Sequence, residues 1–201
     1  MWDWIGTQAP ALNAVLNALM LVIWLAYLQL FFTSFRRANR TVVHIGMASE
    51  NGEDARCLVT NMGSDVAYIL AVLIELDFGD ERRSATVTDR VEDDDPIGGD
   101  FRDKTNQGPL RGGEAIDIGS LRKIVRRAAH QMGEDMSLDR CEAVDITVVV
   151  AAQQAHKLSG GRKCYEISRE AGRMRFRPTS VLTAQVGSRR QQRALLKRVN
   201  G

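Results

Sequence analysis

Residues 66–78 read VAYILAVLIELDF, a run of aliphatic and β-branched side chains that is typical of a β-strand. Residues 144–152, VDITVVVAA, repeat the pattern. Because successive side chains of a strand point to opposite faces, every second residue of each run should lie in the core. The residues predicted to be buried are Val66, Tyr68, Leu70, Val72, Ile74 and Leu76 in the first run, and Val144, Ile146, Val148 and Val150 in the second. These two stretches are the predicted core strands.

Further short strand-like segments surround these two, separated by Gly, Asn and Asp. They are residues 41–45, 55–60, 84–88, 114–118, 163–168 and 173–177. One helix near residues 120–130 interrupts them, with Ser120 as its N-cap, Gly133 beyond its end, and an apolar face of Leu121, Ile124, Val125 and Ala128. The glycines of 159–162, SGGR, are interpreted as a hairpin loop. Alternating strand–helix units are absent, so the sequence predicts an antiparallel β-sandwich over residues 41–178.

Residues 11–32, ALNAVLNALMLVIWLAYLQLFF, contain no charged side chain. As a helix they would be about 33 Å long, enough to span the ~30 Å hydrocarbon core of a bilayer. A secretory signal normally has a basic start and a shorter apolar stretch, whereas Asp3 is the one charge before this segment. We interpret residues 1–35 as an uncleaved transmembrane anchor; a buried core helix is the alternative.

Arginines mark one end of this segment. Arg36, Arg37 and Arg40 follow it and no Lys or Arg precedes it, so the positive-inside rule predicts an outside N-terminus and a cytoplasmic domain in a bacterial inner membrane. Asn13, Ala14, Asn17 and Ala18 occupy one helical face at small-xxx-small spacing. This face predicts association with another membrane helix, including that of a second copy, although water near the outer interface would also satisfy both Asn.

The 201 residues carry 27 Lys and Arg against 25 Asp and Glu, so the formal net charge of +2 does not indicate a general nucleic-acid binder. Hydrophobic residues make up 44% and charged residues 26%, which excludes wholesale disorder. The charges nevertheless form blocks. Residues 89–103, DRVEDDDPIGGDFRD, predict an acidic loop, since the spacing of a calcium loop is missing.

Residues 179–201 form a basic tail, predicted to end in a short helix. Its cations could contact anionic lipid beside the anchor, and they are Arg189, Arg190, Arg193, Lys197 and Arg198. Leu195, Leu196 and Val199 would give this helix an apolar side. A solvated helix is the alternative, and nucleic-acid binding ranks below both because no aromatic residue follows Phe176.

No recognisable catalytic, metal or phosphate motif occurs in the sequence. Cys57, Cys141 and Cys164 lack metal-ligand or disulfide spacing, so we expect free thiols, no metal and no cofactor. Cys57 is expected to be a buried strand residue. His44 lies one predicted strand earlier, and a Cys57–His44 pair across a hairpin is the sole enzyme hypothesis, which we rank below a non-catalytic role. His130 and His156 lie in no motif.

Two sequence signatures carry a resemblance over roughly residues 55–152. The run LVTNMGS, residues 58–64, precedes an apolar strand, and LRGGE, residues 110–114, precedes Ile116 and Ile118 and, later, VDITVVV. Asn61 with Gly63, and Gly112 with Gly113, supply turns that tolerate a positive φ. This V-x-N-x-G turn and L-x-x-G-E motif resemble those of bacterial immunoglobulin-like domains of the adhesion-related type. The anchor followed by ARCLVTNMGS is also similar to uncharacterised bacterial single-pass inner-membrane proteins.

The resemblance implies an architecture and no activity. We therefore expect a membrane-anchored cytoplasmic module that binds or regulates another membrane or cytoplasmic protein without catalysis. An accessory subunit of a channel or transporter complex is the main alternative, and a Cys/His-dependent enzyme is the lesser one.

Overall fold

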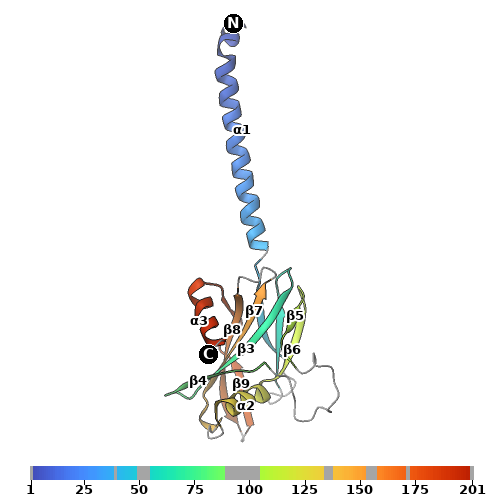
Figure 1. The fold of residues 1–201 in the computed structure, drawn as a ribbon, viewed down its shortest axis with the longest axis vertical. Coiled ribbons are helices and arrows are strands. Elements are labelled where there is room, and N and C mark those ends of the chain that lie inside the picture. Colours follow the sequence, from blue (N-terminus) through green and yellow to red (C-terminus); the bar gives the residue numbers. More distant parts are fainter. Residues whose placement is uncertain are drawn as a thin grey trace. The chain divides into compact units, whose positions relative to one another are not determined.

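The computed structural model describes residues 2–38, 40–48, 55–88, 105–133, 138–152, 158–170 and 173–199. The chain divides into two compact units, Met1–Arg40 and Thr41–Gly201. The first is one helix, and the second is a mainly β domain (Figure 1). The predicted acidic loop, 89–103, lies outside the described residues.

The N-terminal unit is helix α1, Trp2–Ala38. Residues Ala9–Arg36 form a span that is long and apolar enough to cross a membrane. Its large apolar side chains, from Leu12 to Phe35, are exposed. Toward its C-terminal end the rings of Phe31 and Phe35 stack with centroids 6.3 Å apart, and the Arg36 guanidinium lies 5.6 Å from the Phe32 ring centroid. Signal sequences share this length and apolarity.

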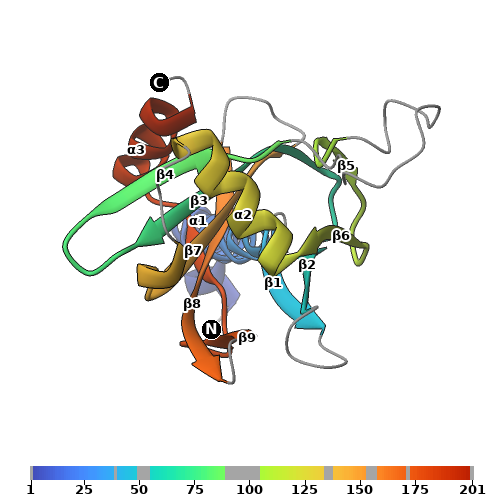
Figure 2. The ribbon, with the colours of Figure 1, turned by 90° about the horizontal axis from the view of Figure 1, so that it is seen from below.

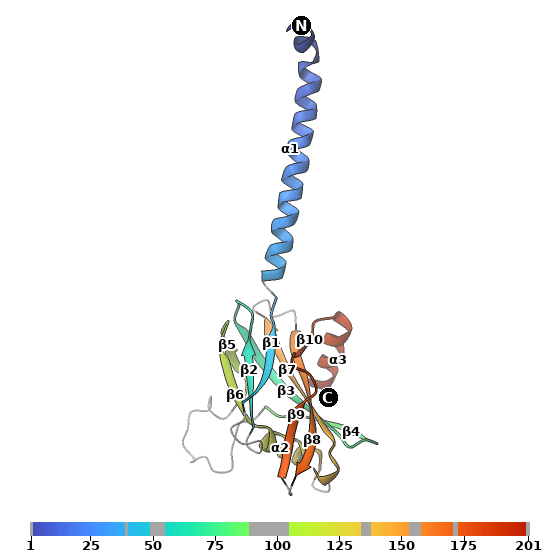
Figure 3. The ribbon, with the colours of Figure 1, turned by 180° about the vertical axis from the view of Figure 1, so that it is seen from behind.

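The domain contains two antiparallel sheets, seen from behind in Figure 3. The smaller sheet has the order β1-β2-β6, with β1 Val43–Ala48, β2 Arg56–Asn61 and β6 Ala115–Ser120. The larger has the order β10-β8-β7-β3-β4, in which β5 also pairs with β3 and β9 with β8. Its strands are β3 Ala67–Asp77, β4 Arg82–Thr86, β5 Gly108–Leu110, β7 Ala143–Ala152, β8 Leu158–Glu170, β9 Arg173–Pro178 and β10 Ala184–Val186.

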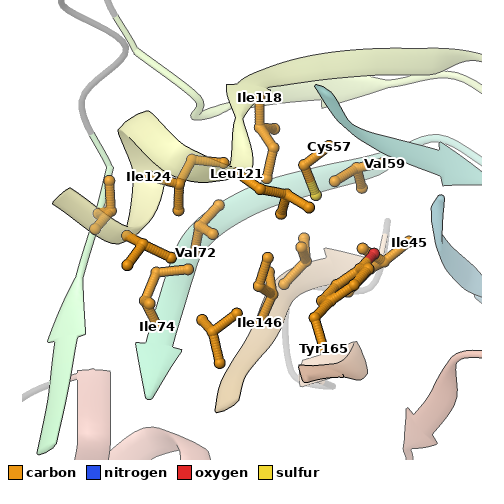
Figure 4. Close-up of a cluster of buried hydrophobic side chains, with 14 of the residues drawn as sticks. Ile45, Cys57, Val59, Val72, Ile74, Ile118, Leu121, Ile124, Ile146 and Tyr165 are labelled. Carbon is orange, nitrogen blue, oxygen red and sulfur yellow. The ribbon is translucent and has the colours of Figure 1, made fainter. Parts of the chain in front are cut away.

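Both sheets contribute to one apolar core, which makes the domain a sandwich and confirms the predicted fold class. Figure 4 shows Ile45, Cys57 and Val59 of the smaller sheet facing Val72, Ile146 and Tyr165 of the larger one. The alternation predicted for 144–152 is confirmed, because Val144, Ile146, Val148 and Val150 are all fully buried in this core.

The alternation predicted for 66–78 is correct only beyond Leu70. Ile69 pairs with Val150 and Ala71 with Val149, so Leu70 is an extra residue in β3 with no partner in β7. This β-bulge reverses the faces of the strand. Val72, Ile74 and Leu76 are buried as predicted, but before the bulge Ala67 and Ile69 face the core. Val66 and Tyr68 are 45% and 46% exposed.

The opposite face of β3 is also covered. Ala71 and Leu73 pack with Val149, Val186 and Leu195 in a second apolar cluster. Leu195 belongs to helix α3, Arg189–Val199, which confirms the predicted short basic C-terminal helix. Burial on both faces explains why residues 71–74 of β3 are apolar without interruption.

The structure corrects the interpretation of residues 159–162 as a loop. These residues lie in β8, where Gly160 and Gly161 are buried and pair with Val149 and Val148. A Cβ on Gly160 would lie 2.6 Å from the Val148 carbonyl oxygen, so this strand position requires glycine. Strands β5 and β10 were not predicted; each has three residues, too few to show alternation.

Helix α2, Leu121–Met132, closes one end of the sandwich. Figure 2 shows it crossing from β6 toward β4. Ser120 is the N-cap as predicted, its hydroxyl accepting a hydrogen bond from the Lys123 N–H, and Gly133 follows the last turn with a φ of 123°. The predicted apolar face is buried. We call this end of the domain the distal end, and the opposite end, where the chain enters at Thr41, the proximal end.

Asn61 joins two turns at the proximal end. Its side-chain amide donates to the carbonyl oxygens of Asp65 (2.7 Å) and Leu110 (3.0 Å), and its Oδ1 accepts from Gly63 N–H (3.0 Å). Gly113 has the expected positive φ, 77°, whereas Gly63 does not, because the Asn61 side chain shapes that turn instead. A Cβ on Gly112 would lie 2.5 Å from the Ser64 carbonyl oxygen, so the two turns touch.

Candidate functional site

The free edge of β1 is closed by side chains from a distant part of the chain. The Gln185 amide accepts from Val43 N–H (3.1 Å) and donates to the Val43 carbonyl (2.7 Å). The Thr183 hydroxyl accepts from Ile45 N–H at 2.9 Å. The Lys163 ammonium donates to the Ile45 carbonyl at 2.8 Å. These contacts replace a neighbouring strand and fasten the smaller sheet to the larger one.

The contacts of Lys163, Thr183 and Gln185 with β1 could not be predicted from the sequence, because they join residues 118 to 142 positions apart. Lys163 fell inside a predicted strand, and Thr183 and Gln185 fell in the basic tail. One signal was available: a lysine within an alternating strand is an unusual core residue. Lys163 is only 6% exposed, and burial lowers the pKa of its ammonium.

Cys57 lies in the core near Lys163 and Tyr165. Its side chain is fully buried, and desolvation, followed by the charge of Asp117, raises its pKa to about 12. Desolvation also raises the pKa of Tyr165, and the Lys163 ammonium lies 5.9 Å from the Tyr165 ring centroid. Because a thiolate is the nucleophilic form of cysteine, this protonated thiol is chemically inert at neutral pH.

His44 is not placed beside Cys57. In the register of β1 and β2, His44 pairs with Thr60 and Cys57 pairs with Met47. Val43 and Ile45 face the core, so the intervening His44 side chain points to the other face, where its Nδ1 lies 3.3 Å from the Thr183 hydroxyl. The hairpin neighbourhood expected for His44 and Cys57 is therefore wrong.

The other two cysteines are free thiols. Cys141 is buried and donates to the Ala143 carbonyl at 3.4 Å, while Cys164 is half-buried. Desolvation raises the pKa of both. Within the described ranges, no three His, Cys, Asp or Glu side chains are grouped so as to hold a metal ion.

The predicted membrane-association face lies within α1. Asn13, Ala14, Asn17 and Ala18 are exposed there, with the i,i+4 spacing that places each pair on one side of a helix. Trp24, Tyr27 and Phe31 farther along α1 are also exposed.

Helix α3 begins with a capping box toward the proximal end. The Ser188 hydroxyl accepts from Gln191 N–H and the Gln191 side chain accepts from Ser188 N–H, both at 3.3 Å. Of the five predicted lipid-contact residues, Arg190 and Arg193 have exposed side chains; those of Arg189, Lys197 and Arg198 lie outside the described part. Leu195 is buried against the sheet, so it cannot supply the outward apolar side expected of it.

Helix α2 carries a second basic surface that the sequence patterns did not single out. Arg122, Lys123, Arg126 and His130 are exposed on the side opposite its buried residues, and we call these four residues the α2 basic face. The helix sequence, LRKIVRRAAHQM, contains no acidic residue. A charge count restricted to one helix would have found it.

The chain matches no family model, no curated protein and no solved structure. Functional conclusions therefore rest on the residues and their geometry.

Proposed function

We propose that this protein is a membrane-anchored module that binds or regulates another protein and has no catalytic activity. The observation that carries the proposal is the pairing of an exposed apolar helix, long enough to span a bilayer, with a folded sandwich. The three cysteines support a non-catalytic role. Desolvation raises the pKa of each thiol, and a protonated thiol is a poor nucleophile. An accessory subunit of a channel or transporter complex would use the same parts, with α1 making the contact.

The flanks of α1 support an uncleaved anchor over a cleaved signal. The basic residues follow the span, at Arg36, Arg37 and Arg40, whereas a signal peptide carries them before its apolar part. The stacked Phe31 and Phe35, with Arg36 beside Phe32, give that end the aromatic and cationic character of a membrane interface. The same arginines favour a cytoplasmic domain.

The strand order supports an immunoglobulin-like domain, as the resemblance to bacterial members implies. If β1, β2 and β6 are strands A, B and E, then β4, β3, β7 and β8 follow as C′, C, F and G. Immunoglobulin sandwiches divide their strands between two sheets in this way.

Features of the proximal end support contact with anionic lipid. Only residues 39–42 separate α1 from β1. Met62, Val66 and Tyr68 are exposed apolar side chains at this end, and Arg190 and Arg193 are exposed on the first turns of α3. Each cation near an anionic leaflet contributes about 1 kcal/mol.

Asn13, Ala14, Asn17 and Ala18 would pair α1 with a second membrane helix or a second copy.

Anchoring is tested on the full chain expressed in bacteria. We expect the protein to stay in the membrane pellet after alkaline carbonate extraction, and its intact mass to include the residues of α1, for a total of 22.3 kDa. The comparison variant is Thr7→Lys/Gln8→Lys/Arg36→Gln/Arg37→Gln/Arg40→Gln, which carries its basic residues before the apolar span, in the charge order of a signal. A soluble wild-type protein that lacks α1 would overturn the anchor.

A further inference from the structure

The positive charges of the α2 basic face destabilise the helix that carries them. Arg122 and Lys123 occupy the first turn, where the helix macrodipole is positive and acidic side chains are favoured. Arg122 and Arg126 are four residues apart and share a face, so they repel each other. An anionic group bound across this face would relieve both effects.

The burial pattern of α2 argues against a lipid surface as the occupant. An interfacial helix needs an apolar face free for the bilayer. Leu121, Ile124 and Val125 of α2 are committed to the core, and among the described residues of α2 no large apolar side chain is exposed.

A nucleic acid fits less well than a polypeptide. The α2 basic face spans nine residues from Arg122 to His130, about 12 Å of helix, and offers few phosphate contacts. The helix has no Phe, Tyr or Trp side chain on which a base could stack. Acidic side chains spaced along an extended or helical peptide would match the four-residue spacing of Arg122, Arg126 and His130.

We infer that the α2 basic face docks an acidic polypeptide segment of a partner protein. The inference deepens the proposed interaction role and rests on it. Exposed ion pairs are individually weak, so such docking would be reversible, salt-sensitive and driven by several cations acting together.

The test uses the full chain in detergent and a fluorescein-labelled oligo-glutamate peptide, with binding followed by fluorescence anisotropy. The variant Arg122→Gln/Lys123→Gln/Arg126→Gln is compared with Arg189→Gln/Arg190→Gln/Arg193→Gln, which removes the same charge from α3. We expect the α2 variant to lose about tenfold in affinity, as three exposed ion pairs predict, and the α3 variant to change little. Wild-type binding should also fall steeply with added salt.

Three outcomes would overturn the inference: equal binding by the α2 variant and wild type, an equal loss in both variants, or tighter binding of a single-stranded oligonucleotide that depends on the α2 cations. The last would assign the face to nucleic acid. Thermal unfolding monitors folding, and the α2 variant should keep a cooperative unfolding transition. A negative peptide-binding result would not change the outcome of the carbonate extraction, so the docking inference and the membrane anchor can fail independently.

Discussion

Replacement of Asn61 by alanine should lower the free energy of unfolding of the domain by roughly 3–5 kcal/mol, because each buried group left without its partner costs about 1–3 kcal/mol. The side chain is fully buried and makes three hydrogen bonds, to the carbonyls of Asp65 and Leu110 and from the amide of Gly63. These bonds connect the turn after β2 to the end of β5. Their loss removes the side-chain hydrogen bonds that hold both turns together.

Urea denaturation of the full chain in detergent, followed by far-UV circular dichroism, measures this loss. Tryptophan fluorescence is unsuitable, since Trp2, Trp4 and Trp24 all lie in α1. Gln107→Ala is the matched control, because the Gln107 amide makes one exposed side-chain hydrogen bond, to the Leu70 carbonyl. It should lose less than about 1 kcal/mol. Equal losses in the two variants would show that Asn61 does not organise the turns.

Alkaline pH should destabilise the domain through Cys57. Burial raises the pKa of the folded thiol to about 12, against an ordinary value of 9.0. Between these values the folded state binds a proton that the unfolded state has released, so stability falls as pH rises. The thiol is protonated in both states below pH 9, and its full contribution is present there. The expected slope from Cys57 alone is about 1.4 kcal/mol per pH unit.

The variant Cys57→Ala isolates this effect. Unfolding free energies of both proteins are measured from pH 8 to 11, and their difference should change by about 1.4 kcal/mol per unit above pH 9. Tyr165 and Cys141 also have raised pKa values and add slopes of the same sign to both proteins, which the difference removes. Parallel curves for the two proteins would contradict a buried, protonated Cys57.

The correct sequence predictions depend on local patterns. The alternation of residues 144–150 and the Ser120 cap with its apolar helix face are set by neighbours within a few positions, and the structure has both. The bulge at Leu70 is decided by pairing with β7, which lies far along the chain. Periodicity within residues 66–78 therefore could not place Val66 and Tyr68.

The parts of the domain that the sequence did not predict also depend on distant contacts. Position 160 of β8 requires glycine because the Val148 carbonyl oxygen of β7 approaches too closely for a side chain, and the residues SGGR alone do not reveal this contact. Lys163, Thr183 and Gln185 meet β1 only after both sheets have formed. The exposed cations of α2, by contrast, lie opposite a local apolar pattern and can be read from residues 121–132.

The side of the membrane on which the domain lies tests the account most directly. Reporters fused after Gly201 of the full chain, one active only in the cytoplasm and one only in the periplasm, are compared in a Gram-negative host. Because Arg36, Arg37 and Arg40 follow the span and no basic residue precedes it, we predict activity of the cytoplasmic reporter and silence of the periplasmic one. An active periplasmic reporter with a silent cytoplasmic one would contradict the account.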